Sequence, residues 1–253
     1  MCHGDDSRPP LPDGGGPVTH HGEIALVAAD GNRFAAYAAR AGRPSGAGVV
    51  VMPDVRGLHA FYRDLAVRFA EVGVDAVAID YFGRTAGIGD RSEGFEFRTH
   101  VDRTTPEGIA ADVAAAADHL RSPEGGSVRA VLTVGFCFGG GFSWRQSADT
   151  PGLAGAIGFY GRPQPAAEVA DRMTAPLLML VAGADANIPV AEHEAVAARA
   201  RAHGIDADLV VYDGAPHSFF DRRYAEHAEA CADAWRRVRA FVAARTPVHP
   251  DTD

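Results

Sequence analysis

The sequence contains little cysteine, and its cysteines show no regular spacing. Cys2, Cys137 and Cys231 are the three in 253 residues, and no two of them form a Cys-Xaa-Xaa-Cys pair. An odd, irregular set of this kind indicates neither a disulfide framework nor a zinc site. It favours a reducing compartment, so we expect a cytoplasmic protein without a bound metal.

Long apolar runs and an excess of positive charge are also missing. No stretch approaches the length of a membrane-spanning helix, and the N-terminal segment has no apolar core of the kind found in signal peptides. The 24 Lys and Arg residues are outnumbered by 33 Asp and Glu residues, which gives a formal net charge of −9. The sequence therefore predicts neither a membrane nor a nucleic-acid partner.

The chain is long enough to bury one sizeable core, since 47% of its 253 residues are hydrophobic. Residues 1–17 are rich in Gly, Pro and Asp, which predicts a flexible N-terminal arm. No internal repeat or linker follows. We expect a single domain over residues 18–246 and a short tail over residues 247–253.

Within this domain, apolar runs of strand length alternate with longer helical patterns. Ile24–Val27 and Arg33–Ala39 predict an opening β-hairpin, and the next three elements, Gly48–Met52, Tyr62–Val72 and Ala76–Asp80, predict a β-α-β unit. The later strands are expected at Val128–Val134, Ala154–Phe159, Leu177–Val181 and Leu209–Tyr212, and the later helices at Pro106–Leu120, Gly139–Ser147, Ala191–His203 and Tyr224–Ala244. The fold class is α/β, with a mostly parallel sheet that binds ligands at the carboxyl ends of its strands.

A glycine-rich turn directly follows the expected strand Val128–Val134. Its sequence, Gly135-Phe136-Cys137-Phe138-Gly139, has the Gly-Xaa-nucleophile-Xaa-Gly form of a nucleophile elbow between a strand and a helix. Such a turn strains the central residue and crowds its neighbours, so glycine is needed two positions before and after it. Cys137 is the predicted nucleophile, and the amide of Phe138 is placed at a helix N-terminus to stabilise an oxyanion.

The residues that would activate Cys137 are expected after later strands, because an α/β-hydrolase presents nucleophile, acid and histidine in that order along the chain. Asp185 follows the strand Leu177–Val181 and is the predicted acid. His217 lies beyond the last strand, after a loop that contains Gly214 and Pro216, and is the predicted base. His59 and His100 could approach the pocket, but an ordinary surface role is expected for each.

Three segments together give the chain a family resemblance. Gly135-Phe136-Cys137-Phe138-Gly139-Gly140, Ala182-Gly183-Ala184-Asp185 and Pro216-His217-Ser218-Phe219 resemble the dienelactone hydrolase (carboxymethylenebutenolidase) family of the α/β-hydrolase fold. The similarity extends over about residues 18–244. Cysteine in place of serine within the elbow is the most specific element. The resemblance implies a domain without a large lid and a reaction that needs no cofactor.

The resemblance also implies roles for four further residues. Asp54 would hold the cysteine in its resting state, and the amide of Val55 would be the second oxyanion donor. Arg84, which follows the strand Ala76–Asp80, would bind the carboxylate of a substrate, and Tyr160 would line the pocket. One position departs from the family pattern. Members that cleave dienelactone have a second arginine four residues after the histidine, but this chain has Asp221 there and Arg222 next. That acid argues against dienelactone itself.

The predicted reaction is the cleavage of a small-molecule carboxylic ester or lactone through a thiol ester. The same three residues would also serve a thioesterase, an acyl transferase or a biosynthetic cyclase. A ligand-binding protein that keeps the fold without turnover is a further alternative. The sequence does not separate these reactions, and it predicts no oligomeric state.

Overall fold

The computed structural model describes residues 5–92, 94–221 and 223–247, whose strands join in one sheet with the order β1-β2-β4-β3-β5-β6-β7-β8. The strands are β1 (Val18–Val27), β2 (Arg33–Ala41), β3 (Ala47–Met52), β4 (Asp75–Ile79), β5 (Ala130–Phe136), β6 (Gly155–Phe159), β7 (Leu177–Ala182) and β8 (Ala207–Tyr212). The helices are α1 (Ala60–Glu71), α2 (Gly83–Ala86), α3 (Arg98–Val101), α4 (Pro106–Arg121), α5 (Phe138–Asp149), α6 (Gln164–Ala167), α7 (Val190–Ala202) and α8 (Ala228–Ala244).

The pairing of the strands confirms the predicted topology. β1 and β2 form the opening antiparallel hairpin, and β2 pairs antiparallel with β4. From β4 onward every pairing is parallel, so α1 is the crossover of the expected β-α-β unit between β3 and β4. The carboxyl ends of the parallel strands therefore meet at one edge of the sheet, where ligands bind in folds of this class.

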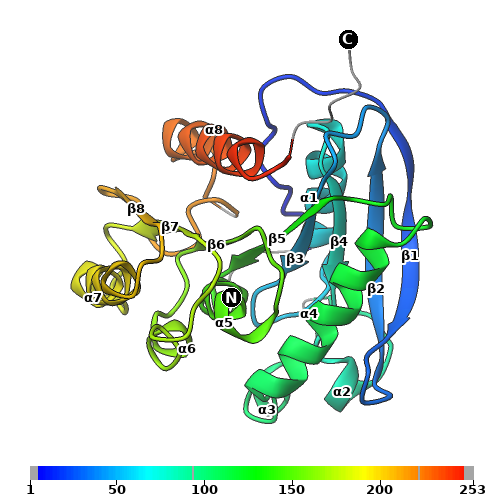
Figure 1. The fold of residues 1–253 in the computed structure, drawn as a ribbon, viewed down its shortest axis with the longest axis horizontal. Helices are drawn as coiled ribbons and strands as arrows, with labels where there is room; N and C mark the ends of the chain where they lie inside the picture. Colours follow the sequence, from blue (N-terminus) through cyan, green and yellow to red (C-terminus); the bar gives the residue numbers. More distant parts are fainter. Residues whose placement is uncertain (1–4, 93, 222, 248–253) are drawn as a thin grey trace.

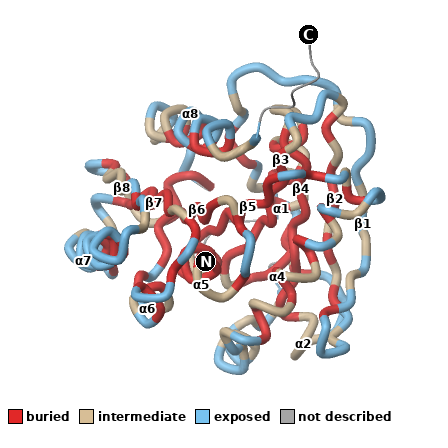
Figure 2. The backbone as a smooth tube through the Cα atoms, viewed as in Figure 1, coloured by how far each residue is buried: buried red, intermediate tan, exposed pale blue. Residues whose placement is uncertain are grey.

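Helices cover both faces of the sheet (Figure 1). α1 and α8 pack on one face, where Phe69 of α1 meets Trp235 of α8 with ring centroids 5.0 Å apart. α4, α5 and α7 pack on the other face. Strands β3 to β7 are buried at every position, whereas β1 at the edge is largely exposed (Figure 2). Burial on both faces explains why the central strands read as continuous apolar runs rather than alternating ones.

Most helix ends agree with the sequence signals. Periodicity did not predict the short helices of two segments, which are α2 and α3 before α4, and α6 after β6. Thr105 is the N-cap of α4, and its side chain accepts a hydrogen bond from the Gly108 amide, as expected of Thr before Pro106. α8 begins at Ala228 instead of Tyr224, because the preceding residues form turns in which the amides of Tyr224, Glu226 and His227 bond three residues back. The segment between β4 and α4 holds the short helices α2 and α3. No helix in the described residues has the length and apolar character needed to cross a membrane.

The described part of the N-terminal arm, residues 5–17, lies against the domain. Asp5 contacts the Nε2 of His59 at 2.8 Å, and the carbonyl oxygen of Pro10 accepts a hydrogen bond from the Trp235 indole at 3.0 Å. Arg239 of α8 donates to the carbonyl oxygen of Asp13 at 2.7 Å. Composition did not predict these contacts, because each partner of the arm is remote in sequence. The boundary at residue 17 stays a prediction.

A buried ion pair anchors the segment between β4 and α4. Asp80 follows β4 directly, and its Oδ2 lies 2.9 Å from Nη2 of Arg91, with side chains 0% and 3% exposed. Burial raises the pKa of Asp80, and the Arg91 guanidinium opposes that rise. The pair fixes the loop that leads to α3, so removal of one partner leaves a charge buried without compensation.

We expect Arg91→Met to lower the free energy of unfolding by about 3–5 kcal/mol, because Asp80 would keep its buried site without a counter-charge. Urea unfolding followed by circular dichroism measures this loss. Arg98→Met on the exposed surface of α3 is the matched control, with an expected change within about 0.5 kcal/mol. Equal stability of the two variants would contradict the assignment.

Candidate active site

The predicted nucleophile lies in the strained turn that its sequence motif requires. Cys137 joins β5 to α5 with φ 54° and ψ −113°, a backbone conformation that residues other than glycine rarely adopt. A Cβ atom on Gly135 would lie 2.0 Å from the carbonyl oxygen of Gly139. Gly135 is therefore needed for the turn to close, and the closed turn leaves Cys137 partly exposed.

The loop after β3 packs on this turn. The Gly139 amide donates to the carbonyl oxygen of Pro53 at 3.1 Å, and a Cβ on Gly139 would lie 2.2 Å from the carbonyl oxygen of Met52. This contact brings the backbone of Val55 next to the start of α5. In the described part of the chain, the amides of Val55 and Phe138 have no hydrogen-bond acceptor, so both N–H groups are available to a ligand.

The predicted acid and base are in direct contact. Nδ1 of His217 lies 2.6 Å from Oδ2 of Asp185, and the exposed fractions of the two side chains are 29% and 2%. The other carboxylate oxygen of Asp185 accepts the amide of Asn187 at 2.9 Å, which fixes its orientation. Because Asp185 occupies Nδ1, a neutral His217 imidazole carries its proton there and keeps Nε2 as the basic nitrogen.

One cavity of about 620 Å³ is lined by four of the eight predicted site residues: Val55, Cys137, Phe138 and His217. It lies at the carboxyl ends of the strands and has largely apolar walls, as ligand pockets commonly do. Its lining residues are Val55, Val101, Cys137, Phe138, Phe142, Arg162, Gln164, Pro165, Asn187, Ile188 and His217. The cysteine, the histidine and both candidate oxyanion donors thus face the same space.

Two predicted residues are buried and do not line the cavity. Tyr160 is 1% exposed, has φ 38°, and places its ring centroid 5.1 Å from that of His217. Asp54 is fully buried next to Val55, and its Oδ1 accepts the amide of Arg56 at 2.9 Å. Tyr160 thus packs against the imidazole, and Asp54 helps to fix the loop of the second oxyanion donor.

Arg84 is not brought into the cavity. Its Nε and Nη2 atoms donate to the two carboxylate oxygens of Asp112 at 3.0 and 2.8 Å, and its Nη1 contacts Asp30. Asp112 is fully buried, and this burial raises its pKa to about 6. The guanidinium therefore balances a buried carboxylate in α4 rather than facing the cavity.

The second described cysteine differs sharply from Cys137. Cys231 of α8 is 2% exposed, and burial raises the pKa of its thiol to about 12, which keeps it protonated and unreactive.

Asp221 is also buried, and its carboxylate lies 3.4 Å from the hydroxyl of Tyr160. Cys2 and Arg222 lie outside the described residues. Within those residues, no three His, Cys, Asp or Glu side chains are grouped to hold a metal ion.

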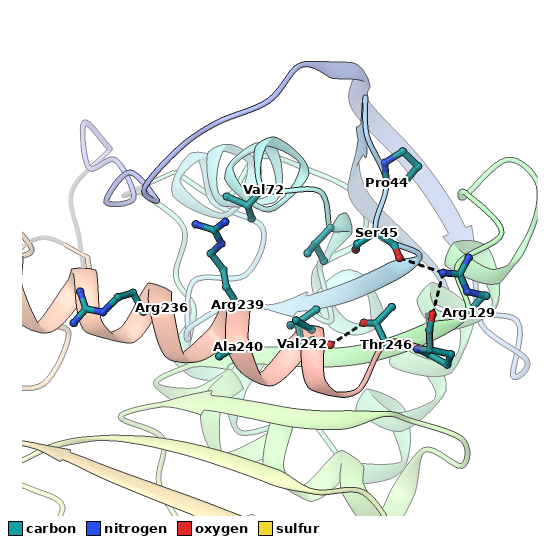
Figure 3. Close-up of a pocket in the computed structure, with 12 residues that line it drawn as sticks. Pro44, Ser45, Val72, Arg129, Arg236, Arg239, Ala240, Val242 and Thr246 are labelled. Carbon is teal, nitrogen blue, oxygen red and sulfur yellow. Dashed lines mark hydrogen bonds between the residues drawn. The ribbon is translucent and has the colours of Figure 1, made fainter. Parts of the chain in front are cut away.

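A larger groove of about 810 Å³ lies elsewhere, between α8 and the loops before β3 and β5 (Figure 3). Its apolar floor includes Val72 and Val242, and Arg129 at its end donates to the carbonyl oxygens of Ser45 and Pro247. No cysteine, histidine or carboxylate is among its lining residues in the described chain. The smaller cavity at the strand ends is therefore the site with chemically reactive groups.

The sequence analysis missed Arg162 and Asn187 as cavity residues. Both lie in loops that directly follow parallel strands, Arg162 after β6 and Asn187 after β7. That position is the signal that could have identified them, because every such loop lies at the ligand-binding edge. Their side-chain orientation depends on the packing of the loops and carries no pattern in the sequence.

Three features together define the α/β-hydrolase class: a mostly parallel sheet covered on both faces, a nucleophile elbow after β5, and a contact between an aspartate after β7 and a histidine after β8. Comparisons with known proteins agree with this class. The model of the dienelactone hydrolase family matches residues 34–245. The chain belongs to the dienelactone hydrolase family, and it is a hydrolytic enzyme that acts on esters or lactones.

Individual relatives cover most of the chain. A Yersinia pestis protein named "Putative carboxymethylenebutenolidase" is 30% identical over 232 residues, which are 87% of this chain and 86% of that protein. The crystal structure of a "Putative Dienelactone Hydrolase" from Klebsiella pneumoniae is 30% identical, has a TM-score of 0.73, and covers 88% of this chain and 99% of its own. A promiscuous phosphotriesterase from metagenomic libraries, 22% identical with a TM-score of 0.73, shares the fold over 90% of this chain and 99% of its own.

We expect Gly139→Ala to lower kcat for ester hydrolysis about 10²- to 10³-fold, the loss typical of one missing oxyanion donor. The added methyl group would push the Met52–Pro53 backbone, and with it Val55, away from the elbow. Steady-state kinetics measure the loss. Gly22→Ala is the control, because a Cβ at Gly22 meets nothing within 4 Å. Wild-type kcat in Gly139→Ala would refute this role for the contact.

Proposed function

We propose that the enzyme cleaves its ester or lactone through a covalent thiol ester on Cys137. The observation that carries this proposal is the convergence on one cavity of a partly exposed cysteine, a histidine held by a buried aspartate, and two amides without acceptors. Each group supplies one need of acyl transfer: a nucleophile, a base and an electrostatic site for the oxyanion.

In the first half of the reaction, Nε2 of His217 takes the proton of the Cys137 thiol, and Sγ attacks the substrate carbonyl carbon. The carbonyl oxygen becomes an oxyanion, which accepts hydrogen bonds from the amides of Phe138 and Val55. When this intermediate collapses, the bond to the alcohol oxygen breaks, and that oxygen takes the proton from His217. The products are the alcohol and the thiol ester.

In the second half, His217 removes a proton from water, and the hydroxide attacks the thiol ester. Collapse of the second intermediate breaks the carbon–sulfur bond and releases the carboxylic acid, and the proton returns to Cys137. Asp185 stays ionised throughout, because its role is to orient the imidazole and to stabilise its positive charge. No step draws on a cofactor, and the absence of a cofactor stays a prediction.

Two further residues have supporting roles in this proposal. Asp54, which is fully buried next to Val55, holds Cys137 in its resting state, and Tyr160 supports the imidazole through its ring contact at 5.1 Å. Arg84 is given no catalytic or binding role, because its guanidinium is held by Asp112 and Asp30. A small-molecule substrate is consistent with a cavity of about 620 Å³.

We expect Cys137→Ala to lower kcat/KM for a p-nitrophenyl ester by about 10⁴-fold or more, and Asp185→Asn by about 10³- to 10⁴-fold. Acid quenching of the wild type during turnover, followed by peptide mass spectrometry, should detect the acyl group on the peptide that contains Cys137. Transfer of the acyl group to added hydroxylamine measures how far the enzyme also acts as an acyl transferase.

Cys231→Ala is the matched control, because this thiol is buried away from the cavity and its loss should leave kcat/KM within about twofold. An acyl group found on another residue, or full activity in Cys137→Ala, would refute the proposed nucleophile.

A further inference from the structure

We infer that Arg162 determines specificity by binding a carboxylate on the substrate, at a point separated from the scissile carbonyl by an apolar segment. This inference rests on the proposed function and adds a substrate class to it. It starts from the charges around the cavity. Apart from His217, Arg162 is the one ionisable cationic side chain among the described lining residues, and no described carboxylate lines the cavity with it.

The backbone of Arg162 is fixed although its side chain is exposed. A Cβ on Gly141 would lie 2.2 Å from the carbonyl oxygen of Arg162, so the loop after β6 rests directly on the start of α5. Nε2 of His193 contacts the carbonyl oxygen of Gly161 at 2.9 Å and holds the same loop from α7. The backbone of Arg162 is therefore fixed relative to the nucleophile elbow, because both pack at the start of α5.

Other described groups do not neutralise this arginine. No ion pair is formed by Arg162 within the described residues, whereas Arg84 is paired to two aspartates. The neighbouring amide of Gln164 donates to Glu192 at 2.7 Å, so that carboxylate is already engaged at the outer rim. In a chain of net charge −9, an unpaired guanidinium at a cavity mouth is a local site of attraction for an anion.

The other lining residues indicate the chemical character of the part of the substrate that joins its carboxylate to the reacting carbonyl. Val55, Phe138, Phe142, Pro165 and Ile188 supply apolar walls to the cavity that Cys137 and Arg162 also line. A guanidinium pairs with a carboxylate through two parallel hydrogen bonds, which gives orientation as well as attraction. The substrate class that fits is an ester or lactone with a short apolar chain that ends in a carboxylate.

The test compares two esters that differ only in charge: mono-p-nitrophenyl adipate, which ends in a carboxylate, and its neutral mono-amide, p-nitrophenyl adipamate. We expect the wild type to prefer the adipate ester. Arg162→Gln should lower kcat/KM for that ester about 10- to 50-fold, mainly through KM, and should change the amide by less than about twofold. Arg162→Lys should restore part of the preference, and raised salt should weaken the preference in the wild type and in Arg162→Lys but not in Arg162→Gln.

Two arginine variants serve as comparisons. Arg199→Gln on the exposed face of α7 should keep the wild-type preference. Arg84→Gln should also keep it, because that guanidinium serves Asp112 and Asp30. An equal loss on both esters in Arg162→Gln, an unchanged preference in that variant, or a loss of preference in Arg84→Gln would overturn the role of Arg162 alone. Failure of the wild type to cleave either ester or p-nitrophenyl acetate would refute the proposed function, and this inference with it.

Discussion

The close approach of backbone to backbone around Cys137 is the constraint on which the rest of the site depends. Gly135 lets the turn between β5 and α5 close, with Cys137 held at φ 54°, and Gly139 lets the loop after β3 pack on it. The next two glycines extend this packing: a Cβ on Gly140 would lie 2.6 Å from the carbonyl oxygen of Phe159, and one on Gly141 would lie 2.2 Å from that of Arg162. One glycine-rich segment thus positions the loops after β3 and β6.

This arrangement couples the position of the nucleophile to that of the groups around it. The loop after β3 brings the Val55 amide to the cysteine, and the loop after β6 brings Tyr160 against the imidazole and Arg162 to the cavity. Separate side chains would each lose conformational freedom if they were held independently. Here the loops that carry these groups pack rigidly on the start of one helix, α5. This shared packing positions the groups together, so the loss of conformational freedom is not repeated for each group.

The arginines near the site differ in whether a buried carboxylate neutralises them. Arg91 and Arg84 each neutralise a fully buried aspartate, Asp80 and Asp112, and so serve the stability of the segment between β4 and α4. Arg162 has no such partner among the described residues and faces the cavity. Residue type alone therefore does not identify an anion-binding arginine. The position of the nearest buried carboxylate separates the structural arginines from the one available to a ligand.

The sequence by itself determined the strands, the longer helices and the family. The apolar runs, the cap at Thr105 and the elbow motif around Cys137 predicted strands, helices and a turn that the structure confirms, because each depends on residues adjacent in the chain. The places of Cys137, Asp185 and His217 after three of the expected strands likewise agree with the structure, in which they follow β5, β7 and β8.

Only the tertiary structure decided which arginine faces the cavity, where the N-terminal arm lies and how the loops rest on the elbow. These outcomes depend on partners far apart in sequence: Asp112 for Arg84, Trp235 for Pro10 and Gly141 for Arg162. A local pattern carries no information on such pairings, because they are set by the packing of complete elements against one another.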